Sequence, residues 1–180
     1  EVLSNGTIGT AGESPYHGNP IVTQYPIRVS PTGGMVLLGS GQLFNAIDLN
    51  LVYTLPEPIS AALWLDGTLW TARKNATRIL LDQWTSLYNR QRTLEISGTV
   101  IELLNINGNI TVVYKRNNTT QFVTLSATED LDNDGLTDLI DLKPAFFDAD
   151  QDSIEDIIDN CVSVSNVDQL NTDNDAEGNV

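Results

Sequence analysis

An 18-residue repetition of aspartates constrains the fold of the last third of this chain more than any other feature. The first copy runs from Asp130 to Asp141 and the second from Asp148 to Asp159, each with Asp at positions 1, 3, 5, 9 and 12 of a twelve-residue window. A hard divalent cation needs several carboxylate oxygens converging on one point, and alternating aspartates in a tight loop supply them. We therefore expect this segment to wrap around Ca²⁺ ions.

The charge of the chain is divided unevenly along its length. Residues 1–126 carry eight acidic and eight basic groups, whereas residues 127–180 carry sixteen acidic groups and one basic group, Lys143. The second part therefore accounts for the formal net charge of −15. We place a domain boundary at Ser126, which divides the chain into a β-rich domain, residues 1–126, and an acidic calcium-binding segment, residues 127–180.

An acidic block of this size excludes some partners. It repels nucleic-acid phosphates and anionic lipid surfaces, so we expect no nucleic-acid partner. No stretch approaches the roughly 20 apolar residues of a membrane helix, so we expect no membrane insertion. An acidic run can also be a solvated tail. The apolar residues at matching places in both copies, such as Leu136 and Ile154, favour a folded repeat instead.

Each copy predicts a set of calcium ligands. The first copy fits the D-x-[DN]-x-[DN]-G pattern of EF-hand loops, with Gly135 at the sharp turn. Its expected ligands are the side chains of Asp130, Asp132, Asp134 and Asp141, the backbone carbonyl of Leu136, and Asp138 directly or through water. The matching ligands of the second copy are Asp148, Asp150, Asp152, Ile154, Asp156 and Asp159. Ser153 replaces the turn glycine there, which predicts a weaker or adjusted second site.

A third, shorter unit begins at Asn171 and continues with Asp173 and Asp175 at positions 3 and 5. These three residues are expected to contribute to a third calcium loop. The spacing between the first two copies leaves no room for the paired helices that flank EF-hand loops. We therefore expect an irregular chain wrapped around ions, with very little apolar core of its own.

The motifs after the second copy resemble thrombospondin type 3 repeats. Asp148–Asp159 is followed by Asn160-Cys161 and then by Asn166-Val-Asp168-Gln169-Leu-Asn171-Thr172-Asp173-Asn-Asp175. The resemblance covers about residues 129–180, with departures at Ser153, Val162, Asn171 and Ala176. It implies secretion, calcium-dependent structure and a spacer or adhesion role. It also implies that Cys161 pairs with a cysteine shortly after the next Asp-rich loop, just beyond Val180.

The preceding region, residues 25–125, is dominated by short β-type runs separated by turn signals such as Asp66-Gly67 and Asn107-Gly108. The predicted strands are Pro26–Val29, Met35–Leu38, Gln42–Asn45, Leu51–Leu55, Ala61–Trp64, Thr68–Ala72, Arg78–Gln83, Ser86–Asn89, Thr93–Ile96, Val100–Ile106, Ile110–Lys115 and Gln121–Leu125. We see no helical periodicity here. The expected fold class is all-β.

The predicted hairpins recur in a way that is typical of β-propeller blades. The turn glycines Gly34, Gly67 and Gly108 are 33 and 41 residues apart, and a period of about 40 residues with four short strands suits one blade. A propeller closes with four to eight blades, more than this region supplies. Either further sequence or another copy completes the ring, or the strands form a β-sandwich of two sheets, which is self-sufficient.

Catalytic signatures are lacking in the sequence. His17 is the single histidine, and no serine or cysteine lies in a recognisable nucleophile elbow. We therefore expect a non-enzymatic, extracellular or cell-surface calcium-binding module with an adhesion, spacer or scaffold role, whose further partner is an extracellular protein or glycan. The alternative is a fragment of a secreted propeller enzyme or lectin that acts on polysaccharide, using carboxylates of the β region.

Overall fold

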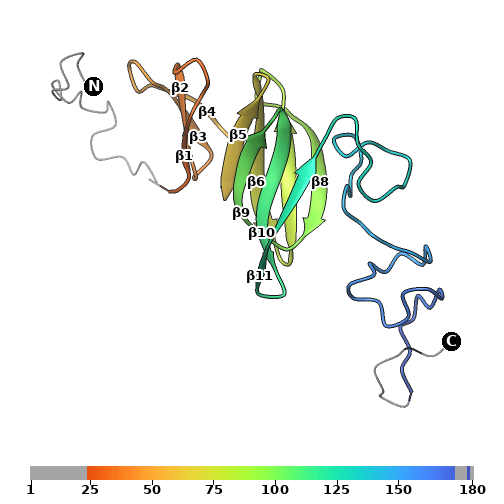
Figure 1. Ribbon diagram of the computed structural model, residues 1–180. Coiled ribbons are helices and arrows are strands. Elements are labelled where there is room, and N and C mark those ends of the chain that lie inside the picture. Colours follow the sequence, from red (N-terminus) through yellow and green to blue (C-terminus); the bar gives the residue numbers. More distant parts are fainter. Residues whose placement is uncertain (1–23, 173–177, 179–180) are drawn as a thin grey trace.

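The computed structural model describes residues 24–172 and 178, and this part of the chain is all-β and contains no helix (Figure 1). Eleven strands form three antiparallel sheets. They are β1 (Ile27–Val29), β2 (Met35–Leu38), β3 (Gln42–Asn45), β4 (Leu51–Thr54), β5 (Ala61–Leu65), β6 (Thr68–Asn75), β7 (Arg78–Trp84), β8 (Arg90–Ser97), β9 (Thr99–Ile106), β10 (Asn109–Arg116) and β11 (Thr119–Leu125). None of the described residues forms a helix long and apolar enough to cross a membrane.

Every sheet is a meander in which neighbours in sequence are neighbours in space. The orders are β1-β2-β3-β4, β5-β6-β7-β8 and β11-β10-β9. Short turns with positive φ make this possible: both residues of Asp66-Gly67 (φ 48° and 78°) and of Asn107-Gly108 (53° and 82°) adopt it. Two successive positive φ values define the type I′ turn, whose twist matches that of the strands it joins. The turns expected from the sequence are confirmed at these positions.

Strands β5–β7 of the middle sheet carry buried residues on both faces, whereas β8 buries one face only. Ala61 and Leu63 of β5 point into a core shared with β9–β11, whereas Ala62 belongs to a second core shared with the first sheet. The three sheets are therefore stacked in layers, and Figure 1 shows β1–β4 beside β5, separate from the larger β5–β11 body.

The sequence predictions are confirmed in their coarse form. The fold is all-β, as expected, and the sheets do not close into a ring or barrel within the described residues. One predicted strand, Ser86–Asn89, is wrong. This stretch is a turn between β7 and β8: the Thr85 amide donates to the Asn89 carbonyl (2.9 Å), and the Tyr88 amide donates back to the Thr85 carbonyl (2.9 Å). Tyr88 has a φ of 59°, which an extended strand does not permit.

A buried charge network ties β6, β7 and β8 together. The carboxylate of Asp82 is fully buried and accepts from Arg73 Nε (2.8 Å) and Thr93 Oγ1 (2.6 Å). Arg90 Nε lies 3.2 Å from Asp82 Oδ1. Because every oxygen of Asp82 has a charged or hydroxyl donor, the cost of burying this carboxylate is offset.

Candidate metal centre

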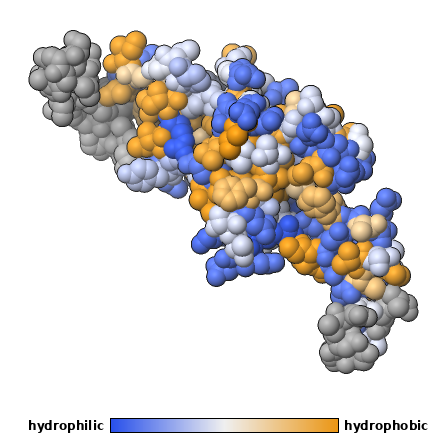
Figure 2. Space-filling model, in the orientation of Figure 1, coloured by the Kyte–Doolittle hydropathy of each residue, from blue (hydrophilic) through white to orange (hydrophobic). Residues whose placement is uncertain are grey.

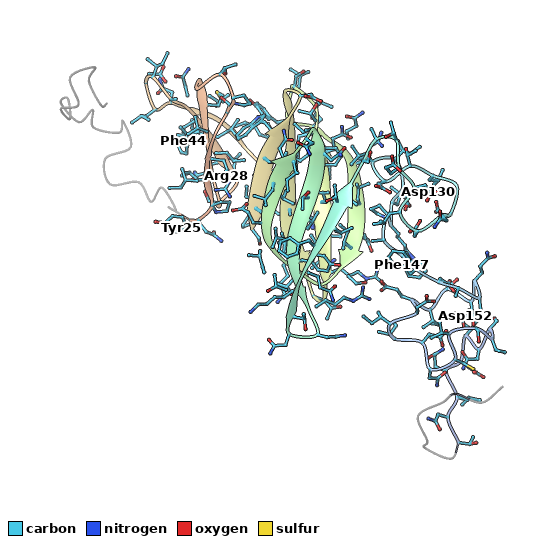
Figure 3. The ribbon with its side chains drawn as sticks, in the orientation of Figure 1. Tyr25, Arg28, Phe44, Asp130, Phe147 and Asp152 are labelled. Atoms are coloured by element: carbon cyan, nitrogen blue, oxygen red, sulfur yellow. The ribbon has the colours of Figure 1, made fainter. Side chains whose placement is uncertain are left out.

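The acidic segment begins where β11 ends, and its residues 127–172 contain no strand or helix. Figure 3 shows Asp130 in a loop next to the sheets and Asp152 in a second loop further along the chain. Leu131, Leu139 and Ala145 pack against the core of the β domain. The segment therefore gains apolar contacts from its neighbour and has no separate core cluster within the described residues, as its composition predicted.

In the first loop, three carboxylates converge. Asp130, Asp132 and Asp134 each present an oxygen, and these three oxygens lie within 4.8 Å of one another. In the second loop, Asp148, Asp150 and Asp152 do the same. Carboxylate oxygens this close repel one another, and a cation between them or a bound proton lowers this repulsion.

In the first loop, one carboxylate oxygen of each of three aspartates accepts from a backbone amide. Asp130 Oδ2 accepts from the Gly135 amide (2.9 Å), and Asp132 Oδ2 accepts from the Phe146 amide (2.9 Å). Asp141 Oδ1 accepts from the Lys143 amide (2.8 Å). The remaining oxygens, Asp130 Oδ1, Asp132 Oδ1 and Asp141 Oδ2, are buried and have no hydrogen-bond donor.

Buried carboxylate oxygens without donors are unusual because desolvating them costs several kcal/mol unless a hydrogen bond or cation replaces the lost water. The second loop repeats the observation at Asp150 Oδ2 and Asp159 Oδ2. All five atoms belong to positions 1, 3 or 12, which are ligand positions in the expected pattern. The donor set is all-oxygen and rich in carboxylate, which suits Ca²⁺ better than a soft transition metal.

The backbones of the two loops repeat each other as closely as their sequences do. Position 6 donates to position 1 (Ser153 to Asp148 Oδ2, 2.9 Å), and position 14 donates to position 12 (Cys161 to Asp159 Oδ1, 2.8 Å), as in the first loop. Three further hydrogen bonds recur in both loops. The amides of Leu136 and Ile154 donate to Oδ1 of Asp134 and Asp152, and the amides of Leu131 and Ala149 donate to Oδ1 of Asp138 and Asp156. The amides of Asp138 and Asp156 donate to the carbonyls of Glu129 and Phe147. The 18-residue repetition in sequence is thus a structural repeat.

Positive φ falls at the same two positions of each loop. Position 4 has φ 62° in Asn133 and 60° in Gln151, and position 6 has φ 96° in Gly135 and 75° in Ser153. This conformation is strained for a residue with a Cβ and unstrained for glycine. The positive φ of Ser153 therefore agrees with the expectation that serine fits this position less easily than glycine does.

The aspartate at position 9 of each loop accepts hydrogen bonds from backbone amides. Asp138 is 1% exposed, and its two oxygens accept from the backbone amides of Leu131 and Ser126, both at 2.8 Å. Ser126 is the residue directly after β11, so this carboxylate ties the loop to the end of the sheet. Asp156 also accepts from a backbone amide within its own loop, that of Ala149.

Crowding perturbs the acidity of the loop carboxylates. Burial raises the pKa of Asp132, and the carboxylates of Asp134 and Asp130 raise it further against the lowering effect of the Phe146 amide. Burial likewise raises the pKa of Asp141, and the Lys143 amide offsets part of this effect. In the second loop, desolvation first and the charge of Asp152 next raise the pKa of Asp150. A divalent cation relieves both causes.

The third unit is only partly described. Asn171 is half-buried, and Asp173 and Asp175 lie outside the described residues, as does His17. Gln169, which the ligand pattern did not single out, joins the second loop to the start of the third unit: its Nε2 donates to Asp159 Oδ1 (2.8 Å) and Asn166 Oδ1 (2.9 Å). The Asn-x-Asp-Gln motif was the sequence signal for this contact.

Contacts between the acidic segment and the β domain also lay beyond the reach of the sequence. Glu155 is 5% exposed and pairs with Arg116 of β10 (Nη2 to Oε1, 2.9 Å), while Ser97 of β8 donates to its Oε2 (2.7 Å). The Glu95 amide donates to the Leu142 carbonyl (2.7 Å). Glu155 occupies position 8 of the second loop, so the loop is attached to the sheets at a fixed point.

Comparisons with protein-family models, with curated proteins and with solved structures found no match to this chain. The interpretation of the two loops as metal sites therefore depends on their own residues and geometry.

Proposed function

We propose that residues 127–180 are a calcium-binding segment of the thrombospondin type 3 kind, in which Ca²⁺ bound by each Asp loop sets the geometry of the chain. The observation that carries the proposal is the set of buried, donor-free carboxylate oxygens at ligand positions of both loops, from Asp130 to Asp159. Leu136 and Ile154 would add backbone carbonyls. Metal binding free energy would then substitute for the apolar core that the segment lacks.

The whole chain is proposed to be a non-enzymatic, extracellular or cell-surface module with an adhesion, spacer or scaffold role. The support is the regular, repeated geometry of two loops attached in series to a layered β domain. Such a segment transmits a fixed direction between the modules it joins only when its ions are bound, and the high free calcium outside cells keeps loops of modest affinity loaded.

The three stacked meanders are proposed to be blade-like units. Each sheet follows the chain order of a blade, and strands β5–β7 of the middle one are buried on both faces, as in stacked blades. Ile27 and Val29 of β1, and Ile101, Leu104 and Phe122 of the third sheet, remain between 40% and 67% exposed. These side chains would be covered if further sheets, or another copy, continued the stack.

Calcium titration calorimetry on the full chain, after removal of ions with a chelator, tests the metal proposal. We expect heat from at least two binding events and slower proteolysis of residues 127–172 when Ca²⁺ is present. The double variant D132N/D150N removes one charge from position 3 of each loop while keeping an oxygen for the backbone donors, and should abolish both effects. D66N is the matched control, because Asn-Gly also forms the β5–β6 turn.

Two results would overturn the proposal. Equal proteolysis rates with and without Ca²⁺, together with no binding heat, would show that the loops hold no ion. Undiminished binding by D132N/D150N would place the ions elsewhere in the chain.

A further inference from the structure

A cavity lined by four basic residues lies where the β domain meets the second Asp loop. Three connections converge there: the β6–β7 turn at Thr77, Gly98 between β8 and β9, and the β10–β11 turn at Asn117. Ser153 and Glu155 of the second loop close the far side. The cavity measures about 460 Å³, within the range of small-molecule pockets, and the end of the β domain that carries the β10–β11 turn is hydrophilic (Figure 2).

Four of the nine basic residues of the chain line this cavity, although the chain as a whole carries a charge of −15. Two of the four are already paired: Arg78 with Glu95 (3.0 Å) and Arg116 with Glu155 (2.9 Å). Lys74 at the end of β6 and Lys115 near the end of β10 are exposed, and neither has an ion-pair partner among the described residues. The cavity therefore offers two uncompensated positive charges to a ligand.

The rest of the lining suits a polar ring. Hydroxyl groups come from Thr77, Thr99 and Ser153, and the side-chain amide of Asn117 adds a donor and an acceptor. Phe146 adds an aromatic surface, against which the C–H face of a sugar can lie. A long polyanion would be repelled by the acidic segment that borders the cavity, whereas a ligand with one or two charges would not.

We propose that this cavity binds an acidic saccharide unit, a sugar ring that carries a carboxylate or a sulfate. The anionic group pairs with Lys74 and Lys115, and the ring hydroxyls take the hydroxyl and amide partners. No aspartate of either Asp loop lines this site, although Ser153 and Glu155 of the second loop do, so the site does not depend on the loops being metal sites. If the second loop does bind Ca²⁺, the ion should hold Ser153 and Glu155 in place at the cavity. Saccharide binding should then be tighter with Ca²⁺ than without it.

The test is calorimetry of the full chain with methyl β-glucuronide and glucose 6-sulfate, with the neutral methyl β-glucoside as the matched control ligand. We expect both anionic sugars to bind and the neutral one not to bind. The variant K74Q/K115Q should weaken binding at least about ten-fold, as expected for lost charge-assisted hydrogen bonds. K74R/K115R keeps both positive charges at the cavity and should retain binding.

Several results would overturn the proposal. These are no binding of either anionic sugar, equal binding by K74Q/K115Q, tighter binding of an N-acetylated Asp-Asp dipeptide than of the sugars, or equally tight binding of plain sulfate and acetate. Both lysines are exposed, so an unchanged thermal transition of K74Q/K115Q verifies that the variant is folded. If a chelator does not change saccharide binding and calcium titration gives no heat, the metal proposal is refuted and the saccharide proposal is not.

Discussion

The backbone strain at position 6 of the second Asp loop makes a quantitative prediction. Ser153 has a φ of 75°, and its equivalent Gly135 has a φ of 96°. An L-residue in this region of backbone space costs roughly 1–2 kcal/mol, a strain that glycine avoids. The prediction assumes that the loop relaxes to another backbone when the ion leaves, so that the strain is a cost of the ion-bound state alone. Part of the gain from glycine is offset by its greater freedom in the relaxed loop.

The variant S153G should therefore stabilise the ion-bound second loop by about 1 kcal/mol, which corresponds to calcium affinity about five-fold higher. The Ser153 side chain is exposed, so its loss removes little packing. The opposite change, G135A, should weaken the first site about ten-fold through strain alone, because a Cβ at residue 135 meets no atom within 4 Å. Both changes keep the backbone amide that donates to position 1 of each loop.

The assay is calcium titration in backgrounds that leave one loop intact, with D150N to silence the second and D132N to silence the first. S153A is the control for S153G, because it removes the hydroxyl while keeping the Cβ, and should bind Ca²⁺ like the parent. If S153G and S153A bind alike, the hydroxyl or the unbound loop controls the affinity, and the strain argument is refuted. Tighter binding by G135A would refute it as well.

Three further predictions concern stability. D138A leaves the buried amide of Ser126 and the partly buried amide of Leu131 without an acceptor. It should lower the free energy of unfolding by about 2–5 kcal/mol, measured by urea titration, with faster hydrogen exchange of those two amides; unchanged exchange would contradict the role given to Asp138. D82A leaves Arg73 and Arg90 facing a buried gap and should cost about 3–5 kcal/mol, measured by thermal unfolding; a loss below about 1 kcal/mol would contradict this. The raised pKa values of Asp132, Asp141 and Asp150 favour the protonated loops. The calcium-free protein should therefore be stabilised below the ordinary Asp pKa of 3.8 and lose that stability as pH rises through the raised values. Calcium affinity should change in the opposite sense and fall on acidification before an ordinary aspartate would titrate, and pH-independent binding between about pH 7 and pH 4 would count against this.

Local features of the chain were predictable because their causes lie within a few residues. The type I′ turn at Asp66-Gly67 results from two residues that tolerate positive φ. The Asp loops result from a spacing that closes on itself within twelve residues, and their internal hydrogen bonds repeat as the sequence does. The predicted strand Ser86–Asn89 failed for the complementary reason, since the hydrogen bonds of Thr85 with Asn89 and Tyr88 make a turn that β propensity alone does not reveal.

Two residues at equivalent places in the repeat show where local reasoning ends. Asp138 and Asp156 are both position 9, yet only Asp138 also holds the end of β11, through Ser126. Thr137 and Glu155 are both position 8, yet only Glu155 meets an arginine of the β domain. The spacing of residues within the repeat does not predict these differences, because they arise from the parts of the folded sheets that lie alongside each loop.

The sequence by itself determined that the chain is all-β and then continues as an acidic segment with two Asp loops, since alternation, turn residues and carboxylate spacing act over short distances. Tertiary structure alone decided that the sheets stack in three layers, that Arg116 anchors the second loop, and that Lys74 and Lys115 face one cavity. Those lysines come from different sheets, and only the packing of one sheet on another brings their charges together. Long-range juxtaposition depends on the sum of many weak contacts, and no short stretch of sequence encodes it.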